Sequence, residues 1–323
     1  MNEDTSFLKS HWDDIFKKYN LYDLMSDISS FQNENGRDLE RVLSHFFKEE
    51  IYKCRGNCRD RGKKVTTPID FFNNKEEIAK AYDYISKNKK FYNGTDIDNL
   101  LLYLRKGPAV YTHIVSNFSP RTARDIYYRY FNSLEGVNVL DTSAGFGARM
   151  SAALLTGANY YGIDPNKSLC LKLRECCDFY IKVGAVCDTQ VCDIRCTGSE
   201  VFIEEWGNKM DVSFTSPPYF NYEFYSDDGF ASTENLDNLR DWVRFFVLPT
   251  IYNTIYYVKP GGYIMINTSM NANGIDLLSI WKRCLSVYSK CLDFIEIFDI
   301  NSKLLANKKG ITYKEPVVVF KKK

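Results

Sequence analysis

The sequence lacks the features that would tie it to a membrane or to secretion. No apolar stretch of the 323 residues approaches the length needed to span a bilayer, and residues 1–14 are acidic and polar rather than signal-like. We therefore expect a cytoplasmic protein with reduced thiols. An excess of one charge is also missing: the formal net charge is +1, so overall charge favours no particular partner. Any nucleic-acid surface must then be a local basic patch.

Histidine is scarce, which counts against a metal centre. The chain has 3 His beside 10 Cys. The pairs Cys54/Cys58 and Cys192/Cys196, with Cys187 near the second pair, have spacings that zinc could use. Neither pair has a partner pair or histidines at matching intervals. We therefore predict no metal site and interpret these thiols as incidental.

The sequence does contain an alternation of β-rich and helical segments after a helical beginning. Hydrophobic residues make up 45% and charged residues 26%, so a sizeable core can be buried. Residues 1–110 are predicted to form a mainly helical N-terminal region, with helices over 38–52 and 75–88. In the predicted domain 111–323, the expected strands are 137–140, 160–163, 185–191, 211–214, 263–267, 292–300 and 316–320. Four helices are expected between them: two begin at residues 148 and 167, and two cover residues 235–258 and 274–289. Such alternation predicts a mostly parallel sheet covered on both faces, and the last two strands predict an antiparallel hairpin at its edge.

A basic stretch lies between the two predicted N-terminal helices. Residues 52–67 hold a group of cations and one acid: Lys53, Arg55, Arg59, Arg61, Lys63 and Lys64 against Asp60. The stretch could meet the phosphates of a nucleic acid or could be a solvated loop, and both interpretations stay open.

A glycine turn follows the strand predicted at 137–140. Doubly wound sheets bind ligands at the carboxyl ends of their strands, and Gly145 and Gly147 would let a ligand lie against the backbone. A plain tight turn is the alternative. The next strand ends in Asp164, where a carboxylate can accept both hydroxyls of a ribose. Because the turn carries Asp141 and lacks a Lys-Ser/Thr pair, it suits a cationic ligand better than a pyrophosphate.

These residues resemble motif I of S-adenosylmethionine-dependent methyltransferases, Asp-x-x-x-Gly-x-Gly. The resemblance implies the Rossmann-like fold of class I methyltransferases and S-adenosylmethionine as cofactor. It places Asp141 and Gly145 beside the methionine moiety and Asp164 at the ribose. Asp193, after the strand predicted to end near 191, would contact the adenine amino group, with a helix cap or turn residue as the equal alternative. The other turn residues in the implied cofactor site are Ser143, Ala144, Phe146 and Gly147.

The segment Asn117-Phe118-Ser119-Pro120 precedes a predicted helix over 121–131. It is similar to the segment that precedes motif I in amino-methyltransferases, where an aromatic ring and a hydroxyl border the methionine end of the cofactor. The resemblance therefore adds Phe118 and Ser119 to the cofactor site. Ser-Pro also simply starts helices, so that interpretation stays open.

A short strand, 211–214, leads into Thr215-Ser216-Pro217-Pro218-Tyr219. The prolines fix this loop and leave its carbonyls free to accept. An exocyclic amino nitrogen of cytosine or adenine is a poor nucleophile, because its lone pair is delocalised into the ring. The Ser216 hydroxyl and the Pro217 carbonyl could bind its two hydrogens and favour a pyramidal nitrogen facing the methyl sulfonium, while Tyr219 offers a face for a flipped base. Geometry and electrostatics would carry this reaction without a covalent intermediate.

The loop closely resembles the Asp/Asn/Ser-Pro-Pro-Tyr signature of DNA amino-methyltransferases, and with Phe220 it is especially like enzymes of phages and restriction systems. The segments 258–263 and 315–320 agree with the same family, and the resemblance covers residues 111–323. It implies DNA as the partner, with the target base flipped into the site, and it implies the catalytic residues Ser216, Pro217, Pro218 and Tyr219. In that family serine at the first position goes more often with cytosine N4 and aspartate with adenine N6, so the resemblance favours cytosine N4.

Departures from the family bear on recognition. Ser143 stands where many members have an aromatic, so Phe118 or Phe146 would have to serve. The residues after Tyr219 are used to complete the sheet, so target recognition falls to the N-terminal region or to the aromatic insert 220–238, which could instead be a packed lid. The alternatives are an RNA base or a protein amide as acceptor, or a non-catalytic nucleic-acid-binding module. C5-cytosine methylation is disfavoured because no cysteine follows a proline.

Overall fold

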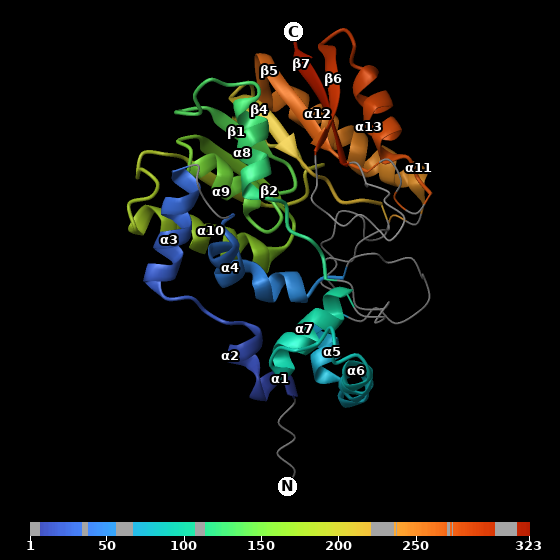
Figure 1. Cartoon of the computed structure of the whole chain (residues 1–323). Coiled ribbons are helices and arrows are strands. Elements are labelled where there is room, and N and C mark those ends of the chain that lie inside the picture. The colour runs from blue at the N-terminus through green and yellow to red at the C-terminus, as the bar shows by residue number, and fades with distance from the viewer. Residues whose placement is uncertain are drawn as a thin grey trace.

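The computed structural model of the protein describes residues 7–33, 38–55, 67–106, 114–220, 236, 238–269, 272, 274–300 and 315–323. Most of the basic stretch at 52–67 and of the insert at 220–238 falls outside the described residues. Within the described part, a seven-stranded sheet carries helices on both faces, and a group of short helices lies at one end of the molecule (Figure 1).

The sheet has the strand order β3-β2-β1-β4-β5-β7-β6. The first five strands in this order are parallel neighbours, whereas β7 pairs antiparallel with both β5 and β6. The predicted fold class is therefore confirmed: a mostly parallel, Rossmann-like sheet of the class I methyltransferase type with an antiparallel edge hairpin. The strands are β1 (Asn138–Asp141), β2 (Asn159–Asp164), β3 (Cys192–Cys196), β4 (Met210–Thr215), β5 (Val258–Asn267), β6 (Leu292–Ile300) and β7 (Glu315–Lys322).

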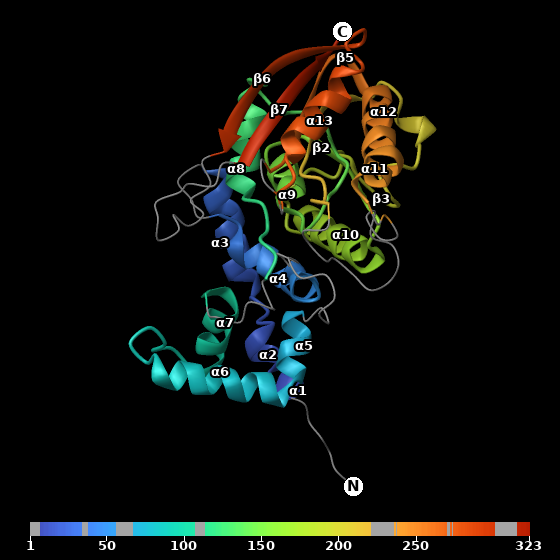
Figure 2. The same cartoon turned by 90° about the vertical axis from the view of Figure 1, so that its right-hand side faces the viewer.

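Alternate residues of the central strands enter two different cores, because successive side chains of a strand point to opposite faces. Phe214 of β4 and Val139 of β1 belong to the first core, whereas Leu140 of β1 and Ile264 of β5 belong to the second. The helices over the first face are α3 (Leu21–Gln32), α4 (Glu40–Tyr52), α8 (Pro120–Tyr128), α9 (Ala148–Leu154) and α10 (Lys167–Lys182), and those over the second are α11 (Leu239–Trp242), α12 (Leu248–Tyr257) and α13 (Leu277–Ser286) (Figures 1 and 2).

A third, smaller core unites the remaining N-terminal helices. Its members include Phe71, Phe72 and Leu100, all buried. Figures 1 and 2 place these helices at the end of the molecule away from β6 and β7. In contrast, α3 and α4 pack into the first core of the sheet, with Phe47 fully buried there. The boundary drawn at residue 110 stays a prediction. The helices of the third core are α1 (Phe7–Ser10), α2 (Trp12–Ile15), α5 (Pro68–Asn73), α6 (Lys75–Lys87) and α7 (Asp96–Lys106).

Three predicted elements are wrong in their bounds, and one of them is the strand expected at 263–267, which begins five residues earlier as β5. The strand expected at 185–191 does not form, and β3 begins at Cys192 instead. The helix expected over 235–258 begins at Leu239 and contains a π-helical turn, Val243–Val247, between α11 and α12. Pro249 explains that turn, because proline has no N–H to give to a carbonyl four residues earlier and its ring would clash there.

In the described part of the chain, none of the helices is both long and apolar enough to cross a membrane.

Candidate active site

The glycine turn between β1 and α9 has the backbone geometry that only glycine adopts easily. Gly145 has φ +56° and Gly147 has φ +71°. A Cβ on Gly147 would lie 2.6 Å from ring atoms of Phe47 in α4, so this position also requires the absence of a side chain. A Cβ on Gly145 would meet nothing closer than 3.7 Å. Gly145 is therefore the point at which a ligand can approach the backbone.

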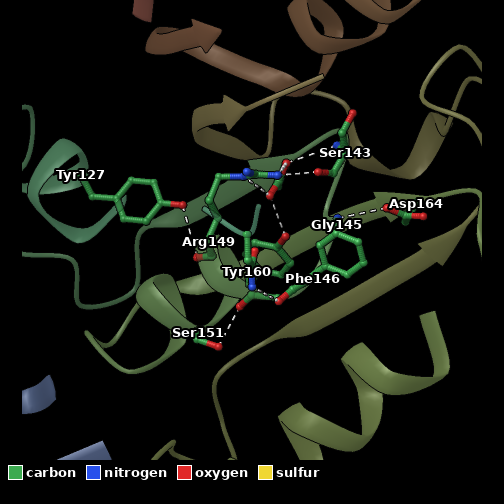
Figure 3. Close-up of polar contacts among 11 residues, drawn as sticks. Tyr127, Ser143, Gly145, Phe146, Arg149, Ser151, Tyr160 and Asp164 are labelled. Carbon is green, nitrogen blue, oxygen red and sulfur yellow. Dashed lines mark hydrogen bonds and ion pairs between the residues drawn. The ribbon is translucent and has the colours of Figure 1, made fainter. Parts of the chain in front are cut away.

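Asp141, at the carboxyl end of β1, is fully buried and has all its partners within the protein. Arg149 Nε lies 2.7 Å from Asp141 Oδ2, and Arg149 Nη2 lies 3.3 Å from Oδ1. Tyr160 donates its hydroxyl to Oδ2 at 2.9 Å, and the Ser143 N–H donates to Oδ1 at 3.2 Å (Figure 3). The Asp141 carboxylate thus stabilises the glycine turn through buried hydrogen bonds. A ligand would contact the turn and not the carboxylate of Asp141.

Arg149, in the first turns of α9, is the main residue that the sequence analysis missed. Its guanidinium also donates to the Ser143 carbonyl at 2.5 Å (Figure 3). The same guanidinium lies 5.5 Å from the centre of the Phe118 ring. It therefore ties the acid, the glycine turn and the segment before α8 together. A single charged residue within the apolar run 148–155 was the available signal, because a buried charge needs a partner.

Asp164 lies at the carboxyl end of β2, as predicted, and is only 8% exposed. Its Oδ2 accepts the Gly145 N–H at 3.0 Å (Figure 3). Its Oδ1 accepts the Asn166 N–H at 3.0 Å. Burial raises the pKa of Asp164 to about 6, because its effect is larger than that of the two hydrogen bonds, which lower the pKa. Each carboxylate oxygen keeps a lone pair, so the ionised group can still accept from a diol.

The segment before α8 meets the glycine turn through Phe118 and its neighbour. The Phe118 ring packs edge-on against Phe214, the residue before the end of β4, at 5.6 Å between centres. Asn117 Nδ2 donates to the Phe146 carbonyl at 3.0 Å. Ser119, in contrast, caps α8 by accepting the Thr122 N–H at 3.2 Å, which is the helix-start interpretation left open above.

Ser119 has a second partner that the sequence did not indicate. Its hydroxyl donates to Asp38 Oδ2 at 2.7 Å, and the other oxygen of Asp38 accepts the Arg121 N–H at 3.2 Å. The N-terminal segment just before α4 is therefore fastened directly to the start of α8.

Asp193 does not lie where it was predicted, because β3 runs from Cys192 to Cys196. Asp193 is the second residue of that strand and pairs in register with Tyr161, whereas Asp164 pairs with Cys196. Its carboxylate is held by the Arg195 guanidinium at 2.8 and 2.9 Å and by Trp206 Nε1 at 3.2 Å. Asp193 therefore lies three residues before Cys196, the residue of β3 that is level with Asp164, and not at the edge of the sheet where the other site residues lie.

The Thr-Ser-Pro-Pro-Tyr loop leaves β4 at the same edge of the sheet. Leu140 of β1 pairs with Ser213 of β4, so Thr215 closes β4 directly beside the start of the glycine turn. Ser216 is half-buried, and Tyr219 is half-buried against the second core. The residues after Phe220 that were predicted to surround a base lie outside the described residues up to 235.

Several buried hydroxyls near this edge have no hydrogen-bond partner among the described residues. Their exposures are between 0% and 3%, and they belong to Thr142, Ser213, Thr215 and Thr268. A buried polar group without a partner costs about 1–3 kcal/mol. The edge between the glycine turn and the loop therefore offers polar groups that a ligand with polar atoms can satisfy.

The remaining predicted cofactor residues surround the same turn. Ser143 and Gly145 are half-buried, whereas Ala144 and Phe146 are buried in the first core. The described residues contain no cluster of three or more His, Cys, Asp or Glu side chains that could hold a metal ion. The Gly145 N–H and the Asp164 carboxylate, 3.0 Å apart, lie within this group of residues.

Comparison with known proteins returns similar structures but no sequence family. No protein-family model matches the chain, and no curated protein matches it in sequence. TrmN from Thermus thermophilus is similar at 15% identity over 64% of this chain and 49% of TrmN, with a TM-score of 0.43, so the chain spans about half the length of TrmN. Geranyl diphosphate methyltransferase in complex with S-adenosylmethionine is similar at 11% identity over 63% of this chain and 85% of that one, with a TM-score of 0.42.

The cyclase SpnF is similar to the same degree, at 13% identity over 63% of this chain and 81% of SpnF, with a TM-score of 0.43. At these identities and TM-scores, the similarities carry no conclusion about activity or substrate. The assignment of the fold rests on the strand order and directions of the sheet itself.

Proposed function

We propose that this protein transfers a methyl group from S-adenosylmethionine to the exocyclic amino group of a base in DNA, with cytosine N4 favoured over adenine N6. One observation carries the proposal. The glycine turn after β1 and the Ser-Pro-Pro-Tyr loop after β4 leave neighbouring parallel strands at the same edge of the sheet. Asp164 is the last residue of β2, the other neighbour of β1. A cofactor turn, a ribose acid and an amino-binding loop therefore converge without any long-range rearrangement.

The residues around Gly145 fit S-adenosylmethionine. The ribose hydroxyls would donate to the free lone pairs of Asp164, which is ionised above a pH of about 6. The methionine portion would lie along the glycine turn, where Gly145 presents no side chain and the Phe118 ring lies beside the Arg149 guanidinium. The cofactor supplies the electrophilic methyl group. Asp141 contributes by fixing the turn, since its carboxylate is already fully engaged.

The catalytic loop would act on the amino group by positioning it. The Ser216 hydroxyl and the Pro217 carbonyl accept its two hydrogens, which draws the nitrogen lone pair out of conjugation and aims it along the attack direction. Tyr219 stacks on the flipped base. The packing of Phe118 against Phe214 supports this arrangement, because it joins the cofactor side of the site to the strand that carries the loop.

Recognition of the DNA sequence is assigned to the N-terminal region and to the insert after Tyr219. The N-terminal region is fixed to the site through two contacts: Asp38 with Ser119, and Phe47 with Gly147. A domain attached in this way can hold DNA at a fixed distance from the catalytic loop.

The decisive experiment separates methyl transfer from cofactor binding. Ser216→Ala and Tyr219→Ala should each abolish transfer to DNA in a labelled-cofactor assay and leave the Kd for S-adenosylmethionine nearly unchanged by calorimetry. Ser286→Ala, an exposed hydroxyl at the end of α13, is the matched control and should change neither. Loss of cofactor binding in either loop variant would refute the assigned roles.

A further inference from the structure

Helix α4 contacts both segments that would hold the cofactor, and Figures 1 and 2 show it beside α10. The ring of Phe47 lies over Gly147 in the glycine turn, where a Cβ would be 2.6 Å from atoms of that ring. One helical turn later, the Glu50 carboxylate accepts the Ser168 hydroxyl at 2.5 Å, at the start of α10. Residues three apart lie on the same face of a helix. One face of α4 therefore contacts both the turn after β1 and the helix after β2.

Glu50 is a buried carboxylate, 3% exposed, and its two oxygens have different partners. Oε2 accepts from Ser168, and Oε1 lies 2.8 Å from Lys53 Nζ, one turn further along α4. The N-terminus of α10 also favours a negative charge beside its first turn, because the N–H groups there point outward. If α4 only packed against α10, an apolar side chain could be buried at this position without the desolvation of a charge. The carboxylate therefore indicates a role for the contact with Ser168.

The segment held by this contact also orients the ribose acid. Asn166 is the N-cap of α10, and its Oδ1 accepts the Leu169 N–H at 3.0 Å and lies 3.2 Å from the Ser168 hydroxyl oxygen. The backbone N–H of Asn166 donates to Asp164 Oδ1 at 3.0 Å. Asn166 thus joins the start of α10, which Glu50 holds, to the carboxylate of Asp164.

We propose that Glu50 is a positioning residue of the cofactor site, which acts through the start of α10 on the Asp164 carboxylate. The assignment rests on the proposed function, in which Asp164 accepts from the ribose of S-adenosylmethionine. Glu50 fixes the first turn of α10, so the Asn166 N–H stays aimed at Asp164 Oδ1. Hydrogen bonds weaken steeply when their geometry is lost, so a displaced carboxylate would accept the ribose hydroxyls poorly. The N-terminal region then contributes to cofactor binding, although it precedes the predicted methyltransferase domain.

Calorimetry with S-adenosylmethionine on the full chain tests this role. Glu50→Ala and Ser168→Ala each remove one side of the contact, and each should raise the Kd about tenfold. The double variant should lose no more affinity than either single variant, because both substitutions break the same contact. Ser168 is exposed, so Ser168→Ala should keep the fold even if the loss of the buried Glu50 does not. Glu49→Ala is the matched control: Glu49 pairs with the same Lys53 at 3.1 Å, and its variant should bind within about twofold of the wild type.

The pH dependence of the affinity separates positioning from a general loss of stability. The Asn166 N–H lowers the pKa of Asp164, so the rise in affinity should move to a pH above about 6 in Ser168→Ala, where that hydrogen bond is disturbed. The charged groups that also act on the pKa of Asp164 are Asp141 of β1 and Arg149 of α9, and neither is changed in this variant. A merely structural role would leave the midpoint where it is in the wild type.

The outcomes distinguish the role of Glu50 from the proposed function. If the wild type binds S-adenosylmethionine and Ser168→Ala keeps either its Kd or its midpoint, the positioning role is overturned and the proposed function stands. Additive losses in the double variant, or an equal loss in Glu49→Ala, would also overturn it. A wild-type protein that binds no S-adenosylmethionine would instead refute the proposed function, and the role of Glu50 with it.

Discussion

Replacing Arg149 with methionine should strongly destabilise the protein, because it would leave the Asp141 carboxylate buried without its countercharge. Arg149 is 6% exposed and Asp141 is fully buried, so water cannot replace the guanidinium. In the variant, Asp141 would keep only the Tyr160 hydroxyl and the Ser143 N–H. Breaking a buried pair by removing one partner costs about 3–5 kcal/mol of unfolding free energy.

The assay is urea denaturation of the wild type, Arg149→Met, Asp141→Asn and the double variant. The double variant, Asp141→Asn with Arg149→Met, should lose less unfolding free energy than Arg149→Met alone, because no buried charge remains in it. The two substitutions should therefore show a favourable coupling energy of about 2 kcal/mol or more. Lys172→Met breaks the exposed pair with Glu175 and is the control, with an expected loss below about 1 kcal/mol. A loss below about 1 kcal/mol for Arg149→Met, or equal losses in the single and double variants, would refute the reasoning.

Two further predictions concern the glycine turn and the ribose acid. Gly147→Ala should destabilise by about 2 kcal/mol or more in urea denaturation, because φ is +71° and Phe47 lies in the way, whereas Gly184→Ala, at φ +70° with open space around it, should lose only about 1 kcal/mol; equal losses would contradict the contact with Phe47. The affinity for S-adenosylmethionine should rise as pH increases through about 6, since Asp164 then ionises and accepts from the ribose. The same raised pKa means that Asp164 makes folding less favourable as pH rises from about 4 to about 6. Calorimetry between pH 5 and pH 7.5, roughly a unit on either side, should show the affinity change in the wild type and a flat profile in Asp164→Asn; a flat wild-type profile would contradict the ribose assignment.

The parts of the site that depend on local chain geometry could be predicted from the sequence. Gly145 and Gly147 were expected to take conformations closed to other residues, and both have positive φ. Asp164 was expected at the end of a strand, and it closes β2. A strand, a glycine turn and a helix follow one another within a few residues, so the pattern itself specifies the arrangement.

The error at Asp193 came from the position of β3 at the edge of the sheet. The segment 185–191 was predicted as a strand from its β-forming residues, but Gly184, at φ +70°, follows the preceding helix and the strand begins only at Cys192. An edge strand is partly exposed, so its residues alternate in polarity, and in β3 only Ile194 is buried. Its pattern was therefore weaker than that of the turn before it.

The contacts between distant segments could not be predicted at all. Ser119 and Asp38 are 81 residues apart in the chain, and Phe47 fills the space over Gly147 from a helix before the predicted domain. Such pairs are set by the packing of α4 and α8 on the sheet, and one sequence carries no periodicity that reveals them. The pairing of Asp141 with Arg149 is different, because both belong to the same strand–turn–helix unit and the lone charge in an apolar helix was visible.

The central claim is tested most directly by incubating the protein with labelled S-adenosylmethionine and unmodified duplex DNA, followed by nucleoside analysis by mass spectrometry. The expected product is N4-methylcytosine, with none formed by Ser216→Ala. If N6-methyladenine were found, it would contradict the preference for cytosine inferred from Ser216, but it would still agree with methyl transfer to an exocyclic amino group. Bound cofactor without any methylated nucleoside, or label found only in RNA of the same sequence, would contradict methylation of DNA by this protein.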